Sequence, residues 1–87
     1  MNTQLYKYTD RIRHADKLIR QESTGTPKEF AQKLQISESY LYTFLDELKT
    51  IGLPLKYSKR RLSYVYTKPV RMVIDIFIET PESPTTR

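Results

Sequence analysis

The chain has 87 residues, a formal net charge of +5 and no cysteine. Its length leaves room for one domain with one hydrophobic core. The lack of cysteine excludes disulfides and thiolate zinc sites from this sequence, and it is typical of a reducing compartment. Residues 1–10 are polar and lack the apolar stretch of a secretory signal. We therefore expect a cytoplasmic protein with no membrane contact, with one domain over residues 1–79 and a flexible tail over residues 80–87.

A first helix is predicted over residues 6–23. Its apolar and aromatic residues recur at steps of four, three and four, which places them on one face of a helix. They are Tyr8, Ile12, Ala15 and Ile19. Gly25 follows at a position where a left-handed glycine commonly ends a helix.

A second, short helix is predicted to begin at Thr26-Pro27-Lys28-Glu29 and to end near Leu34. In this opening a hydroxyl stands at the N-cap, proline at the first helical position and glutamate at the third, which is the pattern of a capping box. Only Gln35, Ile36 and Ser37 separate this helix from the next one. Two helices joined so tightly must cross steeply, as in a helix-turn-helix.

A third helix is predicted to begin after Ser37, which is a natural N-cap residue. Its inward face carries Leu41, Leu45 and Leu48, with Phe44 at the edge of that face. Gly52 and Pro54 then end the helix.

The apolar periodicity next changes from that of a helix to that of a strand. Residues 55–57 and 62–67 are predicted to pair as an antiparallel hairpin around a charged turn at residues 58–61. After Pro69, residues 70–79 are predicted to form a third antiparallel strand. The predicted fold class is therefore α+β, with three helices followed by a β-hairpin and a third strand, which is the layout of a winged helix-turn-helix domain.

Four features of residues 25–66 carry a resemblance to a known class of domain. They are the Gly-Thr-x-x-Glu-Phe-Ala-x-x-Leu opening, the Ile36-Ser37 turn, the leucine face of the third helix, and the Leu53-Pro54-Leu55 entry into a tyrosine-rich hairpin. On these features the chain resembles the winged helix-turn-helix domains that begin bacterial transcriptional regulators of the DeoR and WYL-domain types, and their small stand-alone relatives. The resemblance implies a winged helix fold and binding of double-stranded DNA with the third helix in the major groove.

The third helix supplies one set of candidate DNA-binding residues, because hydroxyls on its N-terminal half can contact bases or phosphates. These candidates are Ser37, Ser39, Tyr40, Tyr42 and Thr43. Tyr40 and Tyr42 have an alternative role as half-buried packing over the first two helices. The proteins that the chain resembles usually carry arginines near the start of this helix, whereas its only cation here is Lys49, near its C-terminal end.

The predicted hairpin supplies the second set of candidates. Six cations and no acid lie between Lys56 and Arg71, and three of the cations, Lys59, Arg60 and Arg61, are consecutive in the turn. Such a turn can reach a phosphate backbone or a narrow minor groove. The alternative is a merely solvated turn. The hairpin tyrosines could stack on single-stranded bases, but cross-strand packing is their commoner role.

The sequence offers no recognisable catalytic chemistry. His14 is the only histidine, cysteine is absent, and the only glycines are Gly25 and Gly52. The common nucleophilic triads, zinc sites and glycine-rich phosphate loops are therefore excluded. We expect a binding module that is not an enzyme and has no cofactor or metal.

Two functions remain open on this reasoning. The first is a small bacterial transcription regulator or architectural protein that binds double-stranded DNA, with the basic turn on the backbone and the third helix in the major groove. The second is a protein-interaction or assembly module with little or no DNA binding, which the lack of arginine in the third helix keeps open. RNA also stays open as a partner.

A homodimer is predicted from the third strand. Val73 and Phe77 lie on the face opposite to Met72, Ile74, Ile76 and Ile78. A strand that is apolar on both faces normally has both faces covered, and an exposed strand edge can pair with another chain. The alternative is that the first helix or the tail of the same chain covers the second face.

Overall fold

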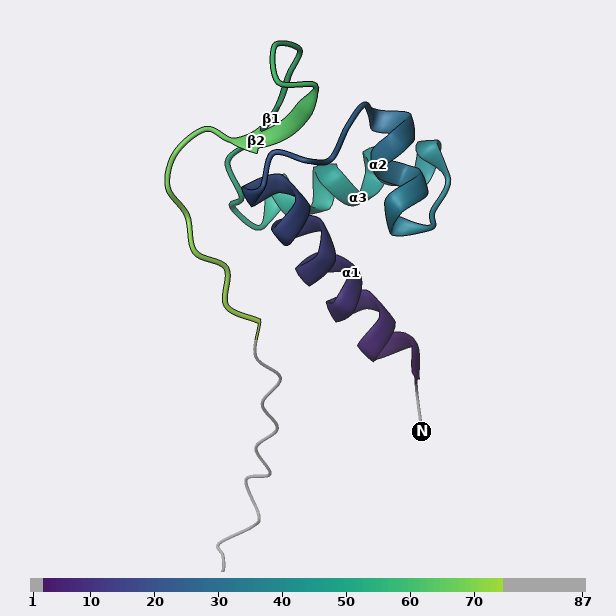
Figure 1. The fold of residues 1–87 in the computed structure, drawn as a ribbon. Coiled ribbons are helices and arrows are strands. Elements are labelled where there is room, and N and C mark those ends of the chain that lie inside the picture. Colours follow the sequence, from purple (N-terminus) through teal and green to yellow (C-terminus); the bar gives the residue numbers. More distant parts are fainter. Residues whose placement is uncertain (1–2, 75–87) are drawn as a thin grey trace, which may run out of the picture.

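The computed structural model describes residues 3–74, which form three helices and one antiparallel hairpin. The elements are, in chain order, α1 (Thr3–Arg20), α2 (Pro27–Leu34), α3 (Glu38–Thr50), β1 (Leu55–Ser58) and β2 (Ser63–Tyr66). In Figure 1 the hairpin stands at one end of the helical cluster and the N-terminal end of α1 lies at the other. The predicted α+β class, with three helices before a hairpin, is confirmed. Over the described residues, no helix has the length and apolar character needed to cross a membrane.

Helix α1 both begins and ends three residues earlier than predicted. It ends at Arg20 because Glu22 adopts a left-handed conformation with φ 53°. The amide of Ser23 then donates to the carbonyl oxygen of Leu18 at 2.9 Å, which closes the helix end in the Schellman arrangement. The prediction that Gly25 ends this helix is wrong, because the left-handed residue comes three positions earlier.

The capping box predicted at the start of α2 is confirmed. The amide of Glu29 donates to Thr26 Oγ1 at 3.2 Å, and the amide of Thr26 donates to Glu29 Oε1 at 2.8 Å. Gly25 has its role here: its φ is 74°, and a Cβ at this position would lie 2.5 Å from Glu29 Oε1. Glycine therefore leaves room for the glutamate that caps the helix.

The tight link between α2 and α3 is also confirmed. Gln35 ends α2 in a left-handed conformation with φ 60°. Ser37 caps α3, because its Oγ accepts a hydrogen bond from the amide of Tyr40 at 3.1 Å. Ile36, between them, is partly buried against the core. Local signals in the sequence thus place the start of α3 at the predicted residue.

One hydrophobic core joins all five elements. The buried apolar side chains are Ile12, Ala15, Ile19, Phe30, Ala31, Leu34, Leu41, Phe44, Leu45, Leu48, Leu53, Leu55 and Tyr64. The inward leucine face predicted for α3 is confirmed. Phe44 is fully buried and not at the edge of this face. On this flank of α3, Tyr40 and Glu47 contact Arg11 and Tyr8 of α1.

A buried pair of hydroxyl residues fastens the hairpin to the helices. Thr24, in the link between α1 and α2, and Ser63, at the start of β2, are both fully buried. The amide of Thr24 donates to Ser63 Oγ at 3.1 Å, and the amide of Tyr64 donates to Thr24 Oγ1 at 2.9 Å. These bonds satisfy polar groups that burial would otherwise leave unpaired.

The hairpin pairs Leu55–Ser58 with Ser63–Tyr66 in antiparallel register, so that the turn comprises residues 59–62. Ser58 therefore belongs to β1 and Leu62 to the turn, each one residue from the predicted strand ends. Tyr57 lies opposite Tyr64 with ring centroids 5.0 Å apart, and the Tyr64 ring also contacts Phe30 at 5.6 Å. The interpretation of these two tyrosines as packing residues is confirmed.

The predicted third strand is not formed over residues 70–74, which are irregular and pair with neither strand of the hairpin. Pro69 explains the break, because it has no amide to donate where the chain leaves β2. Val70, Met72 and Ile74 nevertheless pack against the core, while Val73 is 73% exposed. The predicted alternation of faces is thus present here without a strand. Residues 75–79, Phe77 among them, and the tail over residues 80–87 lie outside the described residues.

Candidate nucleic-acid interface

Helix α3 turns one polar face to solvent, opposite its buried leucines. The exposed residues at the centre of this face are Ser39, Thr43, Asp46 and Thr50. The Thr50 hydroxyl donates to the carbonyl oxygen of Asp46 at 2.9 Å, whereas the hydroxyl of Thr43 is exposed on the N-terminal half. Because this face has no cation and carries Asp46, it offers hydrogen bonds and shape but no net attraction to phosphates.

The two serines at the start of α3 differ in what they can do. The hydroxyl oxygen of Ser37 is engaged as the helix cap, so this residue holds the backbone of α3. The hydroxyl of Ser39 lies 3.4 Å from that of Ser37 and is exposed at the first turn. Of the two, Ser39 is the better placed to contact a ligand in front of α3.

Tyr40 and Tyr42 lie on the two flanks of α3. The Tyr40 ring stacks on Phe44 with centroids 6.4 Å apart, and the guanidinium carbon of Arg11, from α1, lies 5.6 Å from the centre of the Tyr40 ring. Tyr42 is 48% exposed, and its hydroxyl donates to Glu38 Oε2 at 3.2 Å. Desolvation and this hydrogen bond raise the pKa of Tyr42. Tyr40 therefore packs on its neighbours while 37% exposed, and Tyr42, at 48%, is the more exposed of the two.

These flanks face different parts of the molecule. On one flank, Tyr42 and Glu38 are close enough to β2 that their charges add to burial in raising the pKa of Tyr64. On the other flank, the hydroxyl of Tyr8, from α1, donates to Glu47 Oε1 at 3.4 Å. The polar face of α3 is thus bordered by the hairpin on one side and by α1 on the other.

The hairpin turn brings the three predicted cations to the surface, but they are not equivalent. The Arg61 guanidinium pairs with the carboxylate of Glu22, and the Arg61 amide donates to Ser58 Oγ at 3.2 Å. Lys59 and Arg60 are exposed and have no acidic partner among residues 3–74. The turn therefore presents two unpaired cations to a ligand, and the third cation fastens the turn to the end of α1.

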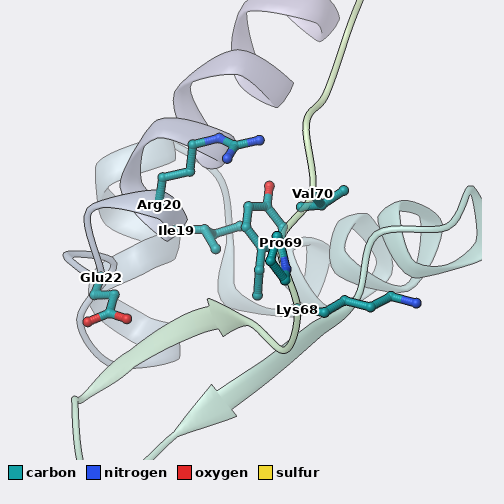
Figure 2. A pocket seen from close by; sticks show the side chains of 7 residues that line it. Ile19, Arg20, Glu22, Lys68, Pro69 and Val70 are labelled. Atoms are coloured by element: carbon teal, nitrogen blue, oxygen red, sulfur yellow. The ribbon is translucent and has the colours of Figure 1, made fainter.

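A hollow lies between the end of α1 and the chain that leaves β2 (Figure 2), and its labelled lining includes Arg20, Glu22 and Lys68. Two of its polar side chains, Arg20 and Tyr66, both bind Asp16 of α1. The Tyr66 hydroxyl donates to Asp16 Oδ1, and Arg20 pairs with Asp16 at 3.0 Å while lying over the Tyr66 ring. Burial and the Asp16 carboxylate raise the pKa of Tyr66. We assign this network to the contact between α1 and β2, so Tyr66 too is a packing residue.

Sequence reasoning missed a row of basic residues on α1. A shallow groove between α1 and α2 is lined by Lys7, Asp10, Arg11, His14, Lys33, Leu34 and Gln35. The spacing of Lys7, Arg11 and His14, at steps of four and three, places them in one row along a helix and could have been noticed. Only the fold, however, brings Arg11 to the N-terminal half of α3.

The chemistry of the whole candidate surface is hydrogen bonding and charge. Among residues 3–74, no three His, Asp or Glu side chains gather where they could hold a metal ion. No family model, no curated protein and no solved structure matches the chain. The features that bear on function are therefore α3, the hairpin turn and the basic residues beside them.

Proposed function

We propose that the chain is a small DNA-binding protein of the winged helix-turn-helix type that acts in transcription regulation. The observation that carries the proposal is the hairpin turn, where Lys59 and Arg60 are exposed and have no acidic partner among residues 3–74. The strand β2 that follows this turn lies beside the exposed, hydroxyl-bearing helix α3. Cations placed in this way bind phosphates and release counterions from DNA.

Each part of the surface has its own task in this proposal. The hairpin turn binds the phosphate backbone without regard to sequence. The contacts of Arg61 and Ser63 with the helical part of the domain hold the hairpin in a fixed orientation. The N-terminal half of α3 enters the major groove, where the hydroxyls of Ser39 and Thr43 contact base edges or phosphates. Because hydroxyls discriminate poorly between bases, we expect a modest preference among sequences.

The proposal is tested by the fluorescence anisotropy of a labelled random-sequence duplex at about 50 and 200 mM salt. We expect binding at low salt that weakens steeply at high salt. Matched single-stranded DNA and double-stranded RNA serve as controls, and tighter binding of either would redirect the proposal to that nucleic acid. No binding of the duplex at low salt would overturn it.

A second candidate function is a protein-interaction module, and a specific observation favours it. Beside the cation-free face of α3 lies a groove lined by Tyr8, Thr43, Asp46, Glu47, Thr50 and Ile51. In this groove Ile51 is 72% exposed and Tyr8 is 39% exposed. An acidic and apolar groove suits a protein segment better than a phosphate backbone. This function predicts no binding of any nucleic acid at low salt.

A homodimer is part of the first proposal, because two copies of the hairpin turn would double the phosphate contacts of a protein with limited readout. The support is Val73, an apolar residue that is 73% exposed although its neighbours Met72 and Ile74 face the core. Phe77, the other residue assigned to this contact, lies outside the described residues.

A further inference from the structure

Three residues of α1 form a row of donors along the groove between α1 and α2. Lys7, Arg11 and His14 follow one another at steps of four and three, so they share one side of the helix. Lys7 and His14 are exposed and Arg11 is partly exposed. The nearest acid along α1 is Asp10, which pairs with Arg13 at 3.7 Å. Within residues 3–74, no member of the row forms an ion pair.

Arg11 connects this row to α3. Its guanidinium carbon lies 5.6 Å from the centre of the Tyr40 ring, and the amide of Tyr40 is the one that Ser37 caps. A guanidinium over an aromatic ring keeps its edge N–H groups available to an anion. Arg11 is therefore held beside the first turn of α3, which is the part that enters the groove in the proposed docking.

The opposite wall of the groove is polar and does not neutralise the row. Gln35, the C-cap of α2, and Lys33 both line this wall. The ammonium group of Lys33 donates to the carbonyl oxygen of Ser23 at 2.6 Å, so that it is already engaged. Lys33 is therefore not part of the proposed site, which consists of the row on α1.

We propose that Lys7, Arg11 and His14 bind phosphates of the DNA backbone on the far side of α3 from the hairpin turn. This inference rests on the proposed function and adds a second electrostatic contact to it. The polar face of α3 has no cation and carries Asp46, so it cannot hold a duplex by charge. Cations on both flanks supply that attraction and leave the helix between them to contact the groove.

The competing interpretation is a solvated row with no ligand. Like charges at a spacing of four along a helix repel each other, and Lys7 and Arg11 have that spacing. A phosphate between them relieves the repulsion. A merely solvated row predicts that its removal leaves DNA binding unchanged, so the two interpretations differ in a measurable way.

The test compares two double variants of α1 by anisotropy with a random-sequence duplex. Lys7→Gln with Arg11→Gln removes two charges from the row, whereas Arg13→Gln with Lys17→Gln removes two charges from another side of the same helix. For each phosphate that the first variant no longer neutralises, we expect its affinity to fall roughly fivefold near 0.15 M salt and the slope of log affinity against log salt to fall by about 0.9. We expect the control variant to change the affinity and the salt slope much less.

Two further variants separate charge from packing. Arg11→Lys keeps the charge beside Tyr40 and should retain most of the affinity. Lys7→Gln with His14→Gln leaves the contact between Arg11 and Tyr40 intact. This variant therefore tests the row even if the loss of Arg11 disturbs the structure of α3. Circular dichroism confirms the fold of each variant.

The outcomes distinguish this inference from the function on which it rests. If the wild type binds DNA and Lys59→Gln with Arg60→Gln weakens it, while both row variants behave like the Arg13 and Lys17 control, the second contact is refuted and the proposed function stands. If the wild type binds no DNA at low salt, the proposed function itself fails. In a hydroxyl-radical footprint, loss of protection at one end of the site in the row variants, but not in the control variant, would show that the row contacts the DNA backbone.

Discussion

The guanidinium of Arg61, in the hairpin turn, pairs with the carboxylate of Glu22, the left-handed residue that closes α1. The two residues are 39 positions apart in the sequence. Both side chains are partly exposed, so the pair contributes little to the free energy of folding. Its consequence is positional, because it holds one end of the turn against the helices and leaves Lys59 and Arg60 pointing into solvent.

We predict that the three cations of the turn contribute unequally to the binding of DNA. Lys59→Gln with Arg60→Gln should weaken binding to every duplex alike and lower the salt slope by about 0.9 for each phosphate that the variant no longer neutralises. Arg61→Gln should change the salt slope less, because this cation already has a carboxylate partner. Anisotropy over a series of salt concentrations measures both effects. An unchanged slope in the folded double variant would remove the turn from the mechanism.

We predict that the N-terminal half of α3 sets the sequence preference. Thr43→Ala and Tyr40→Phe should shift the preferred sequence more than the overall affinity, because each removes one hydroxyl. In Tyr40→Phe the ring still packs on Phe44 and under Arg11. Selection from a random DNA pool measures the shift, with Thr50→Ala as the control because the Thr50 hydroxyl is bonded to its own helix. Identical selected motifs for all these proteins would assign both residues to packing.

We predict that the contact between Thr24 and Ser63 is a main anchor of the hairpin. Ser63→Ala should lower the free energy of unfolding by about 1–3 kcal/mol, because it leaves the buried amide of Thr24 without its acceptor. Ser58→Ala, in the neighbouring strand, removes a more exposed acceptor of the Arg61 amide and should cost less than about 0.5 kcal/mol. Urea denaturation compares the two variants. Equal effects would contradict the assignment.

We predict an acid-sensitive contribution from the capping box of α2. Hydrogen bonds from the backbone and side chain of Thr26 lower the pKa of Glu29. A pKa that is lower in the folded state adds stability above the unfolded-state pKa, and this stability is lost as the pH falls through the folded-state pKa. Glutamine can also close a capping box but does not titrate. Between neutral and acidic pH, the thermal midpoint of the wild type should therefore fall further than that of Glu29→Gln, and parallel curves would disprove the linkage.

We predict that the chain is a homodimer at micromolar concentration and that Val73 contributes to the contact. Val73→Lys should shift the species seen by sedimentation velocity toward the monomer without loss of helical circular dichroism. Leu62→Lys is a matched control, because Leu62 is also an exposed apolar residue, 59% against 73% for Val73. A monomeric wild type would defeat the proposal, and equal dissociation by both variants would argue against an interface specific to Val73.

The sequence by itself determined the features that depend on neighbouring residues. The capping box between Thr26 and Glu29, the Ser37 cap and the leucine face of α3 were all predictable, because their contacts span only three or four positions. The hairpin was predictable to within one residue at the ends of its strands, since the change in apolar periodicity is also a local signal. The candidate cations of the turn were predictable because three of them are consecutive in the sequence between the two predicted strands.

Only the tertiary structure decided which of these groups are available to a ligand. Arg61 proved to be paired with Glu22, Tyr40 was joined by Arg11 from α1, and Phe44 was fully buried. These contacts link residues 29 or more positions apart or depend on how whole helices pack. The packing of residues 70–74 also depends on the tertiary structure, because Val70, Met72 and Ile74 contact the core although this segment pairs with neither strand of the hairpin. Local patterns fix which conformation a segment prefers, whereas the pairing of distant side chains depends on the packing that brings the segments together.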